Sequence, residues 1–328
     1  MTKLIGTTSK GEDVHEVTLA AGDLTITLIT LGVAVTDVRL AGVNHSLTLG
    51  GGHIADYEGE MRHHGTLIGP IANRISTARV RIEGMVYELE RNQDGRIHLH
   101  SGAQGTHRQV WQLGEITDTS ATFHITLPDG ICGLPGNRKI TATYQIEAPA
   151  TLSLAITGTT DATTLMNFAN HSYWNLDGGE SLAGHRLQIA ADHYLPSTAD
   201  DFPTGEVAEV GGTQMDFRQE RVVAPIDPPL DNNFCLSDDD EPLRDVLTLT
   251  GQSGLSMTVS TTALGIQVYD ARDALRPGRA AYEGLAIEAQ GWPDAPTNPH
   301  FPTIKVTPDA PYRQETRWRF SSPDRSNS

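Results

Sequence analysis

Short segments in which apolar and polar residues alternate recur along the whole chain. Thr25–Leu31 reads TITLITL, Lys139–Ile146 reads KITATYQI and Leu152–Thr157 reads LSLAIT. A period of two places every second side chain on the same face of a β-strand. The segments are also rich in Val, Ile and Thr, which fit a pleated, half-buried surface. We therefore predict a β-strand in each of them.

The same pattern continues to the C-terminus. Further predicted strands are Ala121–Leu127, Leu187–Ala190, Val246–Thr250, Leu255–Ser260, Gly265–Tyr269, Thr303–Val306 and Thr316–Phe320. In Ala78–Glu90, two alternating runs flank the dipeptide Glu83-Gly84, which predicts a β-hairpin.

Helical periodicity is scarce, since no run of a dozen residues carries an apolar stripe at i, i+3, i+4 and i+7. Strands at regular spacing, separated by Gly, Pro, Asn and Asp, are typical of a β-sandwich or barrel. We predict an all-β fold, a large antiparallel β-sandwich with few short helices. Residues 1–322 are expected to form a single domain, and residues 323–328 a disordered tail.

The charge balance narrows the classes of molecule that the protein is expected to bind. The 328 residues include 24 Lys+Arg and 41 Asp+Glu, a formal net charge of −17. This charge argues against a nucleic-acid or anionic-membrane partner. The chain has neither a long apolar run nor the apolar core of a signal peptide, and its two cysteines, Cys132 and Cys235, are isolated. We expect a cytoplasmic protein.

Several cofactor motifs are missing or weak. There is no P-loop and no GxSxG nucleophile elbow, and Gly50–Ala55 matches a dinucleotide-binding pattern only loosely. His98 and His100, at i and i+2 on a predicted strand, are a candidate metal pair, but no carboxylate follows closely. We therefore predict no metal site and expect His98 to be structural or to support a residue of the site from behind.

Polar side chains concentrate in three segments with apolar or aromatic surroundings. These are residues 69–75 with their continuation at 98–102, residues 167–176, and residues 287–294. The second reads Asn170-His171-Ser172-Tyr173-Trp174-Asn175-Leu176, the first contains Asn73-Arg74-Ile75 and His100, and the third contains Glu288. With these motifs in this order, the chain resembles the aldose 1-epimerase family, also called galactose mutarotases.

The resemblance implies a galactose mutarotase-like supersandwich and an isomerase that interconverts the α and β anomers of a free aldose such as galactose or glucose. Such a reaction needs one base, one acid and no cofactor. A small sugar would be the partner, and the chain would act as a monomer or homodimer.

The resemblance also assigns roles. Glu288 would be the base, because its apolar segment would raise the carboxyl pKa toward neutrality. His171 would be the acid, since an imidazole exchanges protons near pH 7. His100 would hydrogen-bond the ring oxygen or the C1 hydroxyl. The expected sugar-binding residues are Asn73, Arg74, Asp231 and Gln267. Trp174 and Trp292 are candidates for stacking on the sugar, but a position in the core is the favoured interpretation for both.

Other functions stay open at this point. A non-catalytic carbohydrate-binding module would use the same contacts without the acid–base pair. A mutarotase for a phosphorylated hexose would need a cationic clamp, for which Arg62, Arg91 and Arg96 are the candidates. A glycosidase is disfavoured, because the partner of Glu288 is a histidine and not a second carboxylate.

Overall fold

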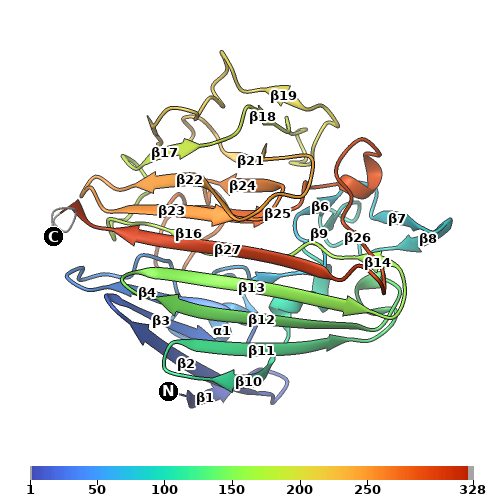
Figure 1. Ribbon diagram of the computed structural model, residues 1–328, viewed down its shortest axis with the longest axis horizontal. Coiled ribbons are helices and arrows are strands. Elements are labelled where there is room, and N and C mark those ends of the chain that lie inside the picture. The colour runs from blue at the N-terminus through green and yellow to red at the C-terminus, as the bar shows by residue number, and fades with distance from the viewer. Residues whose placement is uncertain (1, 324–328) are drawn as a thin grey trace.

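The longest alternating segments form one antiparallel sheet of nine strands in the computed structural model, which describes residues 2–323. Its strands are β10 (Gln112–Ile116), β11 (Ser120–Leu127), β12 (Arg138–Glu147), β13 (Thr151–Thr160), β17 (Arg186–Ile189), β20 (Arg221–Val222), β22 (Arg244–Thr250), β23 (Ser256–Thr261) and β27 (Tyr312–Ser321). Their spatial order is β10-β11-β12-β13-β27-β23-β22-β17-β20. This sheet runs across the whole of Figure 1.

A second sheet comes from the N-terminal part of the chain. It consists of β1 (Thr2–Thr7), β2 (Asp13–Ala21), β3 (Leu24–Ile29) and β4 (Ala34–Leu40), paired in that order. It packs beside β11 and β12, at the lower edge of Figure 1. Burial alternates along β2 and β3, so one face of this sheet points to the core.

A third sheet, of six strands, carries much of the candidate chemistry. Its members are β16 (Tyr173–Trp174), β18 (His193–Tyr194), β19 (Ala208–Glu209), β21 (Asp231–Cys235), β24 (Gly265–Tyr269) and β25 (Leu285–Gln290), in the order β16-β25-β24-β21-β18-β19. All six residues of β25 are buried. A strand covered on both faces shows no alternation in sequence.

Four short strand pairs complete the β-structure. They are β5 (Leu67–Ile68) with β15 (Ala169–Asn170), β6 (Arg74–Ile75) with β9 (His98–Leu99), β7 (Arg79–Ile82) with β8 (Met85–Glu88), and β14 (Thr164–Leu165) with β26 (Lys305–Val306). The β7–β8 pair is the predicted hairpin, and Glu83 and Gly84 both have positive φ, as its tight turn requires.

One continuous hydrophobic cluster holds the three large sheets together. It includes Val17 of β2, Tyr144 of β12, Trp318 of β27 and Ile287 of β25, all at most 2% exposed. Burying a large apolar side chain contributes about 1.5–3 kcal/mol, so this shared core is what fixes the sheets relative to one another. The site is built on that fixed frame.

Helices are few and short, which confirms the all-β prediction. In the described part of the chain they are α1 (Ile54–Glu58) and four 3₁₀ turns, η1 (Gly102–Gln104), η2 (Thr106–Arg108), η3 (Ile131–Gly133) and η4 (Ala295–Thr297). The weak dinucleotide pattern at Gly50–Ala55 does lead into a helix, α1, but this helix has only five residues. Within residues 2–323, no helix is long and apolar enough to cross a membrane. The predicted disordered tail lies, except for Pro323, outside the described residues.

Candidate active site

A cavity of about 220 Å³ lies beside the six-stranded sheet. Four of that sheet's strands, β16, β21, β24 and β25, each contribute a lining residue. Six of the seven predicted site residues line it: Asn73, Arg74, His100, His171, Asp231 and Glu288. The fold thus brings together residues that are up to 215 positions apart in sequence.

Glu288 lies in the middle of β25, opposite Gln267 of β24, and is 2% exposed. Its Oε1 is 3.5 Å from Nε2 of His171, whereas its Oε2 is buried without a hydrogen-bond partner among the described groups. Burial raises the pKa of Glu288 well above 4.5, and the negative charge of Asp231 adds to this effect. A carboxyl group with a raised pKa and a free lone pair is suited to exchange protons near neutral pH.

His171 is held by backbone hydrogen bonds that continue the β5–β15 pairing. Its N–H donates to the carbonyl of Thr66 (2.9 Å), and its own carbonyl accepts from Gly65 (3.0 Å). The ring is buried, and burial lowers the pKa of His171 to about 4. Burial therefore favours the uncharged form of both partners, a protonated Glu288 and a neutral His171.

His100 is fixed in one tautomer by its neighbour. Its Nδ1 accepts a hydrogen bond from the backbone N–H of Asn73 (3.0 Å), so the ring proton of the neutral imidazole lies on Nε2. Both residues have a left-handed backbone, with φ of 65° for Asn73 and 51° for His100. Asn and His are among the non-glycine residues that adopt this conformation most readily. Here they aim an N–H donor at the cavity.

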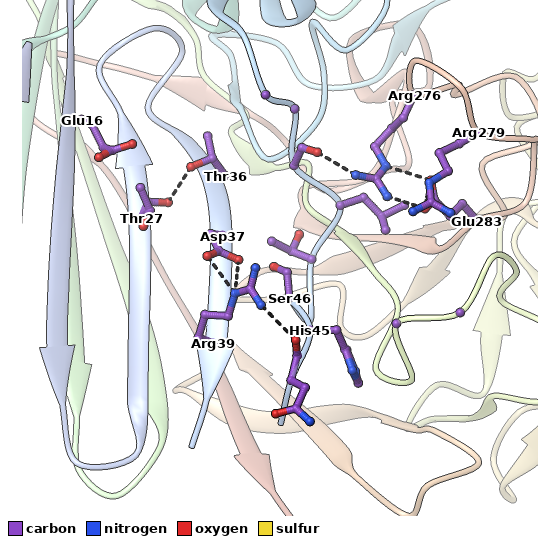
Figure 2. A pocket seen from close by; sticks show the side chains of 18 residues that line it. Glu16, Thr27, Thr36, Asp37, Arg39, His45, Ser46, Arg276, Arg279 and Glu283 are labelled. Carbon is purple, nitrogen blue, oxygen red and sulfur yellow. Dashed lines mark hydrogen bonds and ion pairs between the residues drawn. The ribbon is translucent and has the colours of Figure 1, made fainter. Parts of the chain in front are cut away.

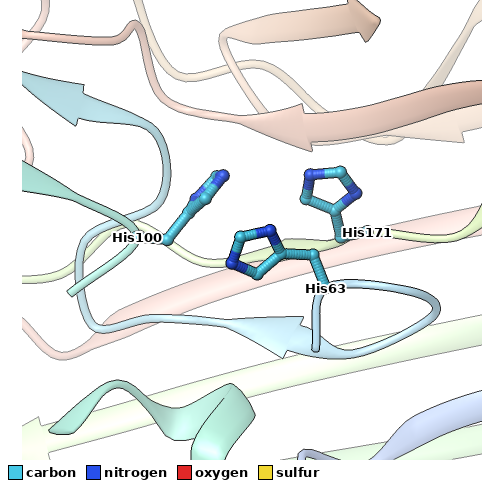
Figure 3. Close-up of side chains that lie close together, drawn as sticks. All are labelled: His63, His100 and His171. Carbon is cyan, nitrogen blue, oxygen red and sulfur yellow. The ribbon is translucent and has the colours of Figure 1, made fainter. Parts of the chain in front are cut away.

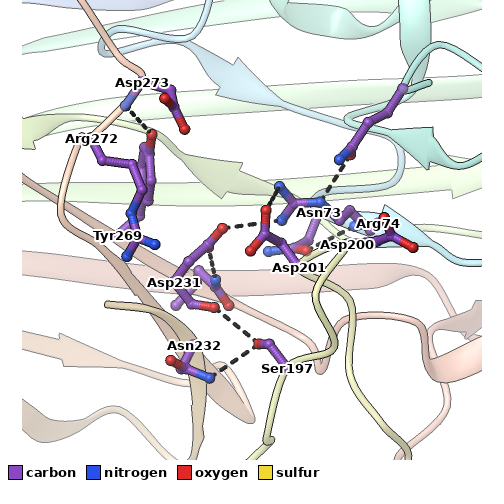
Figure 4. Close-up of polar contacts among 12 residues, drawn as sticks. Asn73, Arg74, Ser197, Asp200, Asp201, Asp231, Asn232, Tyr269, Arg272 and Asp273 are labelled. Atoms are coloured by element: carbon purple, nitrogen blue, oxygen red, sulfur yellow. Dashed lines mark hydrogen bonds and ion pairs between the residues drawn. The ribbon is translucent and has the colours of Figure 1, made fainter. Parts of the chain in front are cut away.

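A second group of polar contacts surrounds Asp231 (Figure 4). Nη1 of Arg74 lies 3.4 Å from Oδ2 of Asp231, and Nη2 lies 3.7 Å from Oδ2 of Asp201. Nε of Arg74 donates to Gln93 (2.9 Å). Asp231 is the first residue of β21, not a loop residue as its acidic sequence context suggests. Carboxylate and guanidinium thus face the cavity with their orientation already fixed.

Gln267 does not line this cavity. Its Nε2 donates to Oδ1 of Asp231 at 2.6 Å, so the structure places it behind that carboxylate. His98 is fully buried and its Nδ1 bonds the carbonyl of Glu90 (2.8 Å). β9 ends before His100, so the regular strand geometry that would place His98 and His100 on one face is absent.

Both candidate tryptophans lie in the core, as favoured from the sequence. Trp174 packs against Trp318 and Phe320, and Trp292 packs against Phe301; neither lines the cavity. The lining aromatic residues are instead Tyr173 and Tyr269. An aromatic residue in a strand can face either the core or the cavity, and here the two indole rings complete the core.

His63 is a cavity residue that the sequence analysis missed (Figure 3). Its ring centroid is 4.8 Å from that of His100 and 5.7 Å from that of His171. Ring nitrogens of these three histidines lie within 4.8 Å of one another, which is the outline of a metal site. However, Nε2 of His100 carries its proton, and a metal ligand needs a free lone pair. The donor set therefore does not fit a metal ion while the Asn73–His100 bond is intact.

An acid–base pair that opens onto a polar cavity, on an all-β scaffold, is an arrangement suited to an enzyme acting on a sugar. Comparison with known proteins gives the family. The profile described as aldose 1-epimerase matches residues 15–319, so the chain belongs to the aldose 1-epimerase family and is an isomerase.

Relatives match over nearly their full length. The galactose mutarotase of Rattus norvegicus is 30% identical over 330 residues, covering 95% of this chain and 96% of the relative. The aldose 1-epimerase of Escherichia coli (strain K12) is 29% identical over 326 residues, covering 90% and 92%. The crystal structure of an aldose epimerase homologue from C. elegans superposes with a TM-score of 0.86 at 26% identity, covering 94% of this chain and 98% of that one.

Proposed function

We propose that this protein interconverts the α and β anomers of a free, uncharged aldose such as galactose or glucose. The observation that carries the proposal is the 3.5 Å contact between Glu288 and His171 inside a cavity lined with polar groups. Family membership and the names of the rat and Escherichia coli relatives support it.

The pair supplies one proton acceptor and one donor. Moving the shared proton from Glu288 to His171 leaves a carboxylate and an imidazolium. Glu288 then takes the proton of the C1 hydroxyl while His171 protonates the ring oxygen, and the C1–O5 bond breaks. After rotation about C1–C2, O5 closes on the other face of C1 as both protons return. The pair ends with the proton it began with, so the cycle needs no outside acid or base.

The remaining residues hold the sugar during these transfers. His100 donates from Nε2 toward the ring oxygen or O1, where charge develops as the ring opens. Arg74 and Asn73 donate to hydroxyl groups, and Asp231 accepts from them. Gln267 keeps Asp231 oriented through the 2.6 Å hydrogen bond. A positioned acid or base contributes about 10²–10⁴-fold each, which suits a reaction that already proceeds slowly in water.

The charges around the cavity favour a neutral substrate. Of the three arginines considered for a phosphate clamp, only Arg62 lines the cavity. Arg91 is paired with Glu88 (2.9 Å) and Arg96 with Asp200 (3.1 Å). Carboxylates of Glu60, Asp201 and Asp273 also line the cavity and would repel a phosphate. A phosphorylated hexose is therefore disfavoured.

The working compartment is part of the proposal. We infer a cytoplasmic enzyme that acts on a small sugar as a monomer or homodimer. The two cysteines are free and buried, which is compatible with a reducing compartment.

The test is NMR saturation exchange on a panel of free aldoses, with wild type and Glu288→Gln. We expect wild type to accelerate anomer exchange and Glu288→Gln to lower kcat at least about 100-fold with the fold retained. Saturable sugar binding without faster exchange would identify a non-catalytic carbohydrate-binding module. Acceleration confined to hexose 6-phosphates would favour the phosphosugar enzyme.

A further inference from the structure

A second cavity, of about 620 Å³, shares two wall segments with the sugar cavity. Figure 2 shows the side chains that line this second cavity, Arg276 and Glu283 among them. The first wall segment is residues 50–64, whose glycine-rich start lines the second cavity and whose end lines the sugar cavity. The other wall segment is residues 272–283, in which Arg272, Asp273 and Ala274 line the sugar cavity and Glu283 lines the second. Neither segment carries the acid or the base.

Arg276 joins these two wall segments. Its Nη1 donates to the carbonyl of Gly50 (2.7 Å), and its Nε donates to Oε2 of Glu283 (2.8 Å). Nη2 of Arg276 bonds the other carboxylate oxygen of Glu283, which makes the pair bidentate. The Glu283 side chain is only 3% exposed, so this carboxylate depends on the guanidinium for its neutralisation.

The two ends of this contact are themselves anchored. A Cβ on Gly50 would lie 1.8 Å from the carbonyl oxygen of Thr36, so this glycine is pressed against β4. The carbonyl of Glu283 accepts from Nδ2 of Asn175 (2.6 Å), four residues beyond His171. Arg276 therefore connects two wall segments of the sugar cavity that are anchored to β4 and to Asn175.

We propose that Arg276 is a positioning residue: its bonds to Glu283 and Gly50 form a latch that sets the width of the sugar cavity. The latch acts on substrate binding, because Arg276 touches neither Glu288 nor His171. This proposal rests on the proposed function, because it takes the molecule bound in the cavity to be an aldose. The hydrogen bonds of the latch itself do not depend on that function.

The chain offers a matched control in Arg279. It lies in the same segment, and its Nε is 3.6 Å from Oε1 of the same Glu283. Its side chain is 44% exposed, and its other partner, Glu180, is 91% exposed. Exposed ion pairs contribute little, so Arg279→Gln should leave the latch closed.

The experiment compares anomer-exchange kinetics of wild type, Arg276→Gln and Arg279→Gln. We expect Arg276→Gln to raise KM at least about tenfold with kcat within about threefold, because uniform binding is lost and the transition state is not specifically affected. Arg279→Gln should keep both constants within about twofold. Equal KM values for the two variants, or an effect of Arg276→Gln on kcat alone, would overturn the proposal that Arg276 sets the width of the sugar cavity.

Two further measurements keep the test decisive. If Arg276→Gln does not fold, Arg276→Lys keeps the charge but cannot bond Gly50 and both oxygens of Glu283 at once, and KM should still rise about threefold. Hydrogen exchange without sugar should show faster exchange in residues 50–64 and 272–283 of the Arg276 variant than of the Arg279 variant. Unchanged exchange there overturns the latch, whereas an inactive wild type with altered exchange overturns only the proposed function.

Discussion

The two ends of the sugar cavity are built in opposite ways. Around Asp231, the polar groups have partners: Arg74 bonds Asp231 and Gln93, and Gln267 bonds Asp231. At the other end, Oε2 of Glu288 and Nδ1 of His171 are buried without a hydrogen-bond partner among the described groups. The groups named at one end are hydrogen-bonded, whereas an oxygen of Glu288 and a nitrogen of His171 at the other end are not.

This difference separates binding from chemistry. A paired carboxylate keeps a fixed direction, which suits the recognition of hydroxyl groups, but its lone pairs are partly engaged. An unpaired buried group costs stability, commonly about 1–3 kcal/mol, and is retained where the free lone pair has a use. We therefore expect changes at the His171 end to act on kcat and changes at the Asp231 end to act on KM.

The largest effect is expected for His171→Ala. Loss of the acid should lower kcat at least about 100-fold, while KM changes by less than about threefold. Polarimetry on fresh α-D-galactose would measure both constants, with thermal unfolding as the control for folding. A fall in kcat of less than tenfold would remove His171 from the acid role.

Asp231→Asn should act mainly on KM. Hydrogen bonds to a charged group contribute about 1.5–3 kcal/mol, so KM should rise at least about tenfold with a smaller change in kcat. Asparagine keeps the size of the side chain and an acceptor oxygen, which protects the fold. If kcat falls as far as it does in His171→Ala, the two ends are not separable in the way the contacts suggest.

The pH profile sharpens the same comparison. Activity needs one proton on the Glu288–His171 pair, so kcat/KM should be bell-shaped, with an acid limb near pH 4, where His171 gains a proton. The alkaline limb follows the raised pKa of Glu288, above which the pair loses its proton. Asp231→Asn removes a charge that raises this pKa, so the alkaline limb should move to lower pH. An unmoved limb would show that the two ends are not electrostatically coupled.

A smaller effect is expected for Gln267→Leu. It removes the 2.6 Å hydrogen bond to Asp231 but leaves the bond from Arg74. The bond is made to a carboxylate, but it orients Asp231 and does not reach the sugar, so KM should rise only about threefold to tenfold. Isothermal titration with a non-reacting sugar alcohol would check that affinity is the quantity changed. A larger loss than in Asp231→Asn would mean that Gln267 acts directly on the sugar.

The smallest effect is expected for Trp292→Phe. Its Nε1 donates to the carbonyl of Leu264 (2.8 Å), and the ring lies outside the cavity. The substitution should lower the melting temperature by a few degrees and leave KM unchanged. A clear rise in KM would instead show that Trp292 contacts the bound sugar.

The sequence predicted the nine-stranded sheet better than the six-stranded one. β11, β12 and β13 have one buried face, and their alternation is visible in the residues. β21 and β25 are almost wholly buried, so they show no period of two and were not predicted. Alternation reports a difference between two faces, and it vanishes where both faces are packed.

The candidate site shows the same limit. The family resemblance placed Glu288 and His171 in one site, and the structure brings them into contact. His63 carries no motif, and its position follows from the path of the chain between α1 and β5. Whether Trp174 faces the core or the sugar depends on packing across sheets, which a local pattern does not encode.

The register between β24 and β25 places Gln267 opposite Glu288. Inserting or deleting one residue in β25 before Glu288 would turn the side chains of this segment over and present alanine or isoleucine to the substrate. The exposed acidic loop at residues 238–242 has no such restriction. We therefore expect insertions and deletions to be tolerated in that loop but not in β25. In β25, a single inserted residue would abolish turnover without removing any catalytic residue.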